Sequence, residues 1–212
     1  MEPFIKSYQF HFIKKQTQIL LNGQVSTKDP NVLYALQLLA IEKVFELFPD
    51  IDKEQEQILN FIQSIKEREQ AETFLLELKP YVIPFKDIND KFLKNLFPKV
   101  KKLKLPNLEI IDFREISYLG WTDQASERKY LVFVKENKFV GIKGAFKNSN
   151  KKGICSLCNS LGQIGMFITE SKPSVKGTYI NKGRYICQDS MECNQKIINE
   201  EKLIEFIEHM NH

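Results

Sequence analysis

Long apolar segments are missing from this chain of 212 residues. No run approaches the roughly 20 residues that a membrane-spanning helix needs, and the first residues lack the basic stretch followed by an apolar stretch that forms a secretory signal. We therefore expect a cytoplasmic protein that does not contact membranes. The hydrophobic fraction of 42% and the charged fraction of 27% are typical of a folded chain with room for two small domains.

Motifs of the common enzyme classes are also missing. The sequence has no Walker loop, dinucleotide-binding fingerprint or nucleophile elbow, and none of the histidine and cysteine signatures of the zinc deaminases. The three histidines, His11, His209 and His212, have no acid or nucleophile close in sequence that would suggest a catalytic triad. These absences favour a binding protein over an enzyme.

Cysteine is scarce, and its distribution is uneven. All four cysteines lie after residue 150, and a reducing cytoplasm makes disulfides between them rare. Cys155 and Cys158 form a C-x2-C pair, and after an interval of 28 residues Cys187 and Cys193 form a C-x5-C pair. This grouping predicts one structural zinc ion. Buried free thiols, or a redox pair at the first two cysteines, are the alternatives.

Each cysteine pair has a sequence context suited to a metal. Small and polar residues surround the first pair, so both sulfurs can turn toward one point while neighbouring amides hydrogen-bond them. The second pair lies where a predicted strand leads into a helix capped by Asp189 or Ser190. A knuckle, a hairpin and a helix-borne ligand are the layout of a treble-clef zinc finger, here over residues 153–212. Since four thiolates fill a tetrahedral ion, the predicted zinc is a scaffold without catalytic chemistry.

Glycine is nearly absent from the first 80 residues, where Gly23 is the only one. The periodic apolar positions of this region predict four helices. The first spans residues 3–21 and ends at Asn22-Gly23, the second runs from Asp29-Pro30 to Pro49, the third is capped by Asp50 or Asp52, and the fourth covers residues 71–78. Because the connections are short, we predict an antiparallel four-helix bundle as the first domain, residues 1–80.

The second domain, residues 81–212, is predicted to be mixed α/β, so that the whole chain is α+β. It begins with a linker at residues 81–85 and a helix that Asp87 caps and Phe97 ends. An extended lysine-rich segment with one buried apolar edge follows at residues 99–105. Predicted strands of a mostly antiparallel sheet cover residues 116–121, 130–134, 139–146, 165–169 and 178–186, and two helices begin at about Ser190 and Glu200.

Charge is distributed unevenly along the chain. The first 80 residues carry 9 basic and 12 acidic groups, residues 81–153 carry 16 and 8, and the rest carry 6 and 7. The basic excess of the middle segment suits an acidic partner, either a protein or a nucleic acid, although a solvated lysine-rich surface has the same composition.

Several segments, together with the cysteines, resemble those of one family. They are the junction Tyr81-Val82-Ile83-Pro84-Phe85, the lysine-rich residues 99–106, Gly120-Trp121 with residues 125–130, and residues 183–194. Over nearly its whole length the chain resembles the FusB-type fusidic-acid resistance proteins, which bind elongation factor G. The resemblance implies a helical bundle joined to an α/β domain with a treble-clef zinc finger. It also implies that the C-terminal domain binds elongation factor G and releases it from ribosomes on which fusidic acid has stalled it, without destruction of the drug.

A partner surface is expected near the second cysteine pair. Lys182 and Arg184 place two cations beside Tyr185, and cationic and aromatic side chains are common binding anchors. The resemblance implies partner contacts around Lys182, Tyr185 and Phe206, and Ile154 stands where the family has an aromatic residue. The alternative for Phe206 is a core role, because it has helical spacing with its apolar neighbours. We expect a monomer that meets the ribosome only indirectly, through elongation factor G.

Two other functions are open. The basic middle segment, with Trp121, Tyr130 and Phe133, is compatible with a zinc-finger protein that binds nucleic acid such as ribosomal RNA, although no DNA binding is expected. The second alternative function is a zinc-dependent enzyme that acts on the drug, and a closed site of four thiolates argues against it.

Overall fold

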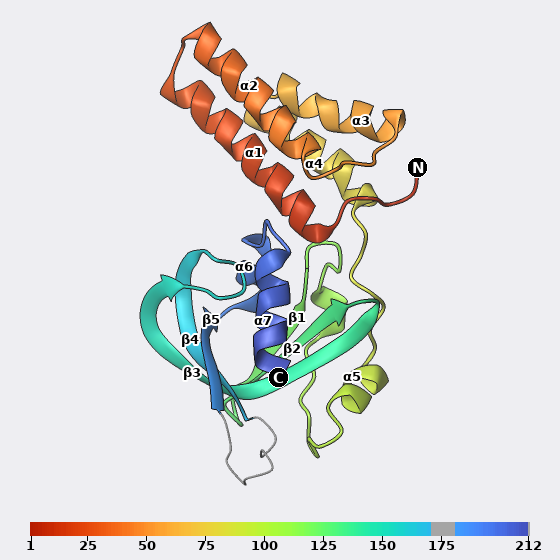
Figure 1. Ribbon diagram of the computed structural model, residues 1–212, viewed down its shortest axis with the longest axis vertical. Coiled ribbons are helices and arrows are strands. Elements are labelled where there is room, and N and C mark those ends of the chain that lie inside the picture. The colour runs from red at the N-terminus through yellow and green to blue at the C-terminus, as the bar shows by residue number, and fades with distance from the viewer. Residues whose placement is uncertain (171–180, 212) are drawn as a thin grey trace. The chain divides into compact units, whose positions relative to one another are not determined.

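The computed structural model describes residues 1–170 and 181–211 and contains two compact units, Met1–Ile83 and Pro84–His212 (Figure 1). The first unit is helical, and the five described strands all belong to the second. The mixed helix and sheet class predicted from the sequence is therefore confirmed. The boundary between these units is at Ile83–Pro84, three residues after the boundary that the sequence predicts.

The N-terminal unit has four α-helices around one apolar core that includes Ile13, Leu59 and Phe74. The helices are α1 (Ser7–Ser26), α2 (Pro30–Phe45), α3 (Lys53–Asn60) and α4 (Arg68–Leu78), and 3-10 turns follow at Phe61–Ser64 and Lys79–Tyr81. The helices α1 and α2 form a long antiparallel pair, whereas α3 and α4 are shorter (Figure 1). The antiparallel geometry expected of a regular bundle is clearest in this first pair.

Two aspartates start helices where the sequence predicts them. The Asp29 side chain accepts a hydrogen bond from the Asn31 amide, and Pro30 occupies the first turn of α2. Of the two acids considered for α3, Asp52 is the cap, because it accepts from the amides of Glu54 and Gln55. These caps satisfy amides that have no partner within the helix.

Gly23 does not end α1, and the prediction of a left-handed terminus there was wrong. The helix continues to Ser26, and Gly23 is buried in it. A Cβ at this position would lie 2.5 Å from Cδ1 of Leu36 in α2. The absence of a side chain therefore lets the two helices approach closely, which is a tertiary role that the local Asn-Gly signal does not reveal.

The segment predicted as a linker belongs in part to the folded N-terminal unit. Val82 is fully buried and pairs with Ile5 in a parallel bridge. The carbonyl oxygen of Tyr81 accepts hydrogen bonds from the amides of Phe4 and Ile5 at 2.9 and 3.0 Å. These contacts join the two ends of the unit, so its fold extends beyond the last α-helix.

The C-terminal unit is built on one antiparallel sheet with the strand order β1-β2-β3-β4-β5. Its strands are β1 (Leu119–Asp123), β2 (Arg128–Lys135), β3 (Lys138–Ile154), β4 (Leu161–Glu170) and β5 (Asn181–Cys187). The predicted hairpin at residues 135–138 is confirmed, with φ angles of 50° and 62° at Glu136 and Asn137. The strand predicted at 139–146 is longer, since β3 reaches the first cysteine after a register shift between Asn148 and Lys151. The first residues of the strand predicted at 178–186 lie outside the described residues.

Short helices flank this sheet: α5 (Asp90–Leu96), α6 (Ser190–Gln195) and α7 (Glu201–Asn211), with a 3-10 turn at Leu108–Ile110. Asp87 does not cap α5 as predicted. The cap is Asn89, whose side chain accepts from the Phe92 amide at 2.8 Å. The lysine-rich segment has the expected buried edge, because its four lysines are exposed while its apolar residues pack against the core. It is not extended throughout, since turns occur at residues 98–99 and 101–102.

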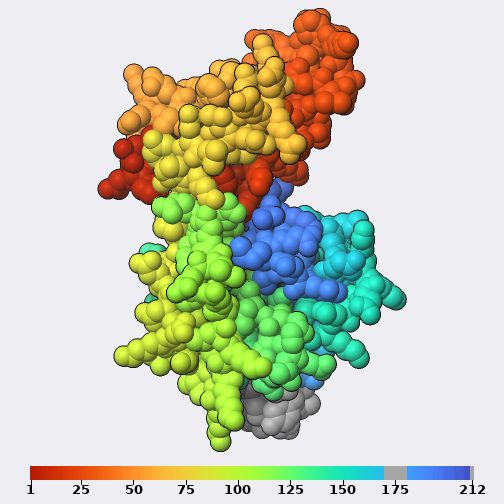
Figure 2. All heavy atoms as spheres, turned by 180° about the vertical axis from the view of Figure 1, so that it is seen from behind, coloured from red at the N-terminus to blue at the C-terminus, as the bar shows by residue number. Residues whose placement is uncertain are grey.

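The two faces of the sheet have different neighbours, since successive side chains of a strand point to opposite faces. On one face, Phe133 and Phe167 lie under α7, whose Phe206 ring is 6.0 and 6.2 Å from theirs between centroids. On the other, Tyr130 and Val132 pack against residues 84–118, which run over the back of this unit in yellow-green (Figure 2). Among the described residues, no helix is long and apolar enough to cross a membrane.

Candidate metal centre and adjoining surface

The four cysteines meet at one point in the C-terminal unit. All four side chains are buried, and the four sulfur atoms lie within 4.8 Å of one another. Cys155 and Cys193 are 3.7 Å apart between sulfurs, as are Cys158 and Cys187. Four converging sulfurs at this spacing suit a tetrahedral ion with bonds of about 2.3 Å.

The first cysteine pair sits in a tight knuckle after β3. The Cys155 amide donates to the Ser160 oxygen at 3.1 Å, and the Asn159 amide donates to the Cys155 oxygen at 2.9 Å. Asn159 has a φ of 50°, a left-handed conformation that asparagine tolerates well. The amides of Leu157 and Cys187 each lie 3.3 Å from the Cys155 sulfur. The knuckle therefore aims amide donors at a sulfur, as the sequence context predicts.

The second pair is held by the end of β5 and the start of α6. Cys187 is the last residue of the strand, and Cys193 is in the first turn of the helix. Of the two predicted caps, Asp189 is the one observed, and it accepts from the amides of Met191 and Glu192. The expected passage from strand to helix is confirmed.

Asn194, next to the last cysteine, fastens α6 to the chain before β1. Its Oδ1 accepts from the amides of Ser117 and Tyr118 at 2.7 and 3.2 Å, and its Nδ2 donates to the oxygens of Tyr118 and Ser190 at 3.0 and 2.9 Å. Gly120 allows this close contact, because a Cβ there would lie 2.5 Å from Oγ of Ser190. The sequence gives no sign of this role for Asn194, because Ser117 and Tyr118 are more than 70 positions away.

The donor set fits one zinc ion. Hydrogen bonds within the cluster hold the pKa of Cys155 far below its usual range and raise the pKa values of Cys187 and Cys193. The four thiols therefore share protons, which metal binding releases, because a thiolate is the form that binds metal. Four sulfur ligands favour zinc over harder cations. With every position filled by protein, such an ion stabilises the fold and has no open site for water or substrate.

Comparisons with known proteins agree with this geometry. Residues 4–86 match the model of the N-terminal domain of elongation factor G-binding protein, and residues 87–210 match the model of the FBP C-terminal treble-clef zinc-finger. The chain belongs to the elongation factor G-binding protein family. The solved structure of the fusidic acid resistance protein FusC is 34% identical, with a TM-score of 0.84 over 97% of both chains. A search among curated proteins gave no match.

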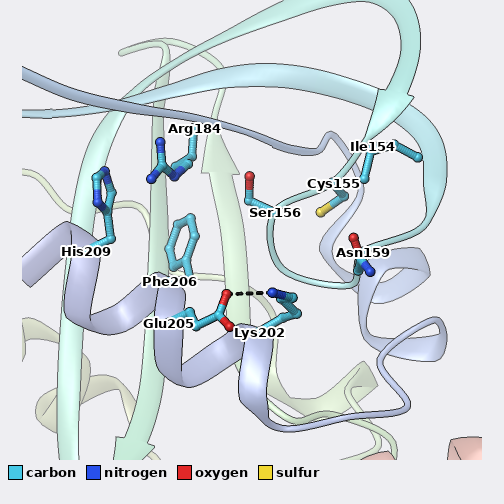
Figure 3. Close-up of a pocket in the computed structure, with 9 residues that line it drawn as sticks. All are labelled: Ile154, Cys155, Ser156, Asn159, Arg184, Lys202, Glu205, Phe206 and His209. Atoms are coloured by element: carbon cyan, nitrogen blue, oxygen red, sulfur yellow. Dashed lines mark hydrogen bonds and ion pairs between the residues drawn. The ribbon is translucent and has the colours of Figure 1, made fainter.

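An open pocket of about 260 Å³ lies beside the metal centre of this family member (Figure 3). Ile154 at the end of β3, Asn159 of the knuckle, Arg184 of β5, and Phe206 and His209 of α7 line it. Lys202 and Glu205 of α7 also line it, and they form an ion pair at 2.7 Å. The zinc ligands thus hold the knuckle and β5 on one side of a pocket whose other side is α7.

The five residues expected at the partner surface have unequal positions. Ile154 and Arg184 are exposed, with 57% of the Ile154 surface accessible. Phe206 is only 3% exposed, so its contacts with Phe133 and Phe167 make it chiefly a core residue that forms the pocket floor. Lys182 donates to the backbone oxygen of His209 at 2.9 Å and so holds the end of α7.

Tyr185 faces away from this pocket. It pairs with Met166 across the β4–β5 ladder, while Arg184 pairs with the buried Phe167. Directly paired residues share a face, so Tyr185 and Arg184 point to opposite sides of the sheet. Tyr185 is 46% exposed there. The sequence places these residues side by side, but strand geometry separates their side chains.

The aromatic residues considered for nucleic-acid stacking lie in the core or, in the case of the half-buried Trp121, pack against it. Tyr130 and Phe133 are buried. Trp121 stacks on Tyr130 at 5.1 Å between centroids, and its Nε1 donates to the Lys104 oxygen at 2.9 Å. Their rings are therefore occupied by protein contacts and form no exposed stacking platform.

Proposed function

We propose that this protein binds elongation factor G through the C-terminal unit and promotes its release from ribosomes stalled by fusidic acid. The observation that carries the proposal is the match of the whole chain to the elongation factor G-binding family, with a closed metal centre beside an exposed cationic surface. Such a protein acts in the cytoplasm, where its partner works, and needs no catalytic site.

Arg184 is the best-placed anchor at the pocket. Its guanidinium is exposed, and its hydrogen bond within the described structure goes only to the adjacent Gly183 oxygen, at 3.5 Å. Burial and then the charges of Arg184 and Lys182 lower the pKa of His209, so this imidazole is neutral at pH 7. The pocket therefore offers a cation above an apolar floor, which suits an acidic side chain of the partner with an apolar neighbour.

Both Arg184 and Tyr185 can contribute because β5 ends the described sheet. Its only strand neighbour there is β4, and a partner that covers the free edge reaches side chains from both faces. In this proposal Arg184, Tyr185 and Ile154 contact the partner, while Lys182 and Phe206 keep α7 in place. A stable interface needs about 800 Å² from each partner, so it extends beyond these residues.

Release follows from a preference for one conformation of the factor. Fusidic acid holds the factor in its ribosome-bound form, and a protein that prefers another form shifts the population only by its difference in affinity. A tenfold gain in release requires about 1.4 kcal/mol of such preference. The drug itself is recovered unchanged in this mechanism, and a modified drug would favour an enzyme instead.

The test is binding of the zinc-loaded chain to purified elongation factor G, measured by calorimetry without RNA. We expect Arg184→Ala and Tyr185→Ala each to weaken binding about tenfold or more, as exposed cationic and aromatic anchors do. The matched control is Arg114→Ala, an exposed arginine of the same unit, and it should bind as the wild type does. Unchanged affinity in both variants would contradict the proposed surface.

The same preparation also tests the alternative function, which is RNA binding. This alternative is supported by four exposed lysines, Lys99, Lys101, Lys102 and Lys104. RNA binding through phosphates would weaken steeply with salt. A plot of log affinity against log salt concentration would have a slope of about −0.7 to −0.9 times the number of phosphates contacted. Tight binding to ribosomal RNA without binding to the factor would overturn the proposal. Sedimentation of drug-stalled ribosomes then measures release of the factor.

A further inference from the structure

Lys129 is a buried lysine beside the metal centre that the four-cysteine motif does not include. It comes from β2, and only 1% of its surface is exposed. Its Nζ donates to the oxygen of Gln188, the residue after Cys187, at 2.7 Å, and contacts Oγ1 of Thr122 at 3.4 Å. The ammonium also lies 4.6 Å from the Phe146 ring centroid. None of these partners in the described structure is a carboxylate.

A buried ammonium without a carboxylate needs another source of negative charge, because desolvation of an unpaired charge is costly. Burial lowers the Lys129 pKa to about 8, and the negative charges of Cys193, Asp189, Cys187 and Cys155 act against that shift. Three of these four groups are metal ligands. A Zn²⁺ ion with four thiolates carries two net negative charges, so the loaded centre and the lysine compensate each other.

Tyr118 brings a second polar group to the same place. It is fully buried and stacks on Phe133 at 5.4 Å between centroids. Its hydroxyl and that of Ser190 are buried without a hydrogen-bond partner of ordinary geometry among the described atoms. A tyrosine hydroxyl is a hydrogen-bond donor at neutral pH, and Asn194, the residue after Cys193, binds the Tyr118 backbone and so holds it against α6. Burial of a hydroxyl without an acceptor is costly, so this donor needs an acceptor close to it.

We propose that Lys129 and Tyr118 form an outer layer of the zinc centre, in which the Lys129 ammonium balances the charge of the four thiolates and the Tyr118 hydroxyl donates to Cys193. Both residues lie outside the cysteine-bearing segments, on β2 and in the chain that leads to β1. The zinc site is therefore completed by the sheet of the same unit, and metal binding depends on the fold of residues far from the ligands in sequence. Mutation of groups that surround metal ligands in this way commonly weakens metal binding about 10- to 100-fold.

The first variant is Lys129→Gln, which keeps a donor for the Gln188 oxygen and removes the charge. We expect zinc affinity, measured by competition with a chromophoric chelator, to fall about tenfold or more. Lys138→Met, at an exposed lysine of β3, is the control for loss of one positive charge and should leave affinity unchanged. If the glutamine variant does not fold, Lys129→Met gives the same test, because it removes the charge and keeps an unbranched apolar side chain. Wild-type affinity in a folded neutral variant would overturn the proposal.

Cobalt substitution distinguishes charge compensation from simple packing. Loss of a nearby cation raises the energy of the sulfur electrons, so the sulfur-to-cobalt charge-transfer bands of Lys129→Gln should shift to longer wavelength, while the d–d bands keep their tetrahedral pattern. Tyr118→Phe removes one hydrogen bond and should shift the same bands by less, with about tenfold weaker metal binding. Tyr34→Phe in α2 is the matched control. Weaker metal binding with unshifted charge-transfer bands would mean a packing role only and would overturn the proposal.

Discussion

The N-terminal unit is held together by one apolar core that runs from Ile5 to Val82. The finger region of the C-terminal unit, which is the treble-clef part that begins at residue 153, instead has four cysteines at its centre. The first arrangement needs regular helices with an apolar side, which residues 1–80 supply. The second arises where a tight knuckle, the end of β5 and a helix of six residues meet around four buried sulfurs. A metal contributes folding energy directly in such a region. The two units should therefore respond to different perturbations.

Removal of the metal has the largest expected effect, and it should affect one unit only. Structural zinc sites contribute about 10–16 kcal/mol of apparent binding free energy near neutral pH, so Cys187→Ser or chelation should unfold the finger region. The N-terminal unit should keep its helices. Zinc analysis should give about one ion per folded wild-type chain, and limited proteolysis should show cleavage confined to the C-terminal unit. A metal-free wild-type protein with an intact C-terminal fold would contradict this expectation.

The converse perturbation is Phe74→Ala in α4. Phe74 is fully buried, so truncation should lower the free energy of unfolding of the N-terminal unit by about 3–5 kcal/mol. Leu76→Ala on the same helix is the control, because Leu76 is largely exposed. Thermal unfolding monitored by circular dichroism measures both, and zinc content should stay constant. A loss of zinc from Phe74→Ala would show that the units are not independent.

A smaller effect is expected within the C-terminal unit for Asn194→Ala. The change leaves the four thiolates in place but removes the acceptor of the Ser117 and Tyr118 amides. Unsatisfied buried groups cost about 1–3 kcal/mol, so the thermal midpoint should fall even in excess zinc. Gln195→Ala, at the exposed next position, should unfold as the wild type does. Equal midpoints for the two variants would mean that the side chain of Asn194 does not hold α6.

The sequence predicted most of the elements because their signals are local. The caps at Asp29 and Asp52, the hairpin at residues 135–138 and the apolar edge of residues 99–105 each depend on a few neighbouring residues. Apart from the cap of α5, where Asn89 takes the place expected for Asp87, predictions were wrong where a distant contact decides the outcome. Gly23 lies inside a helix and allows Leu36 of the next helix to approach, and Val82 pairs with Ile5 where a linker was expected.

For the metal centre, the sequence by itself determined the ligands, since two cysteine pairs at these spacings are typical of a structural zinc site. Only the tertiary structure decided what surrounds them. The pairing of β4 with β5 turns Arg184 and Tyr185 to opposite faces, and the packing of α7 buries Phe206. The sheet also brings Lys129 to the backbone oxygen of Gln188, the residue after Cys187. Ligand identity is a property of residue type and spacing, whereas face, burial and neighbouring charge depend on which strands pair, and no local pattern encodes that pairing.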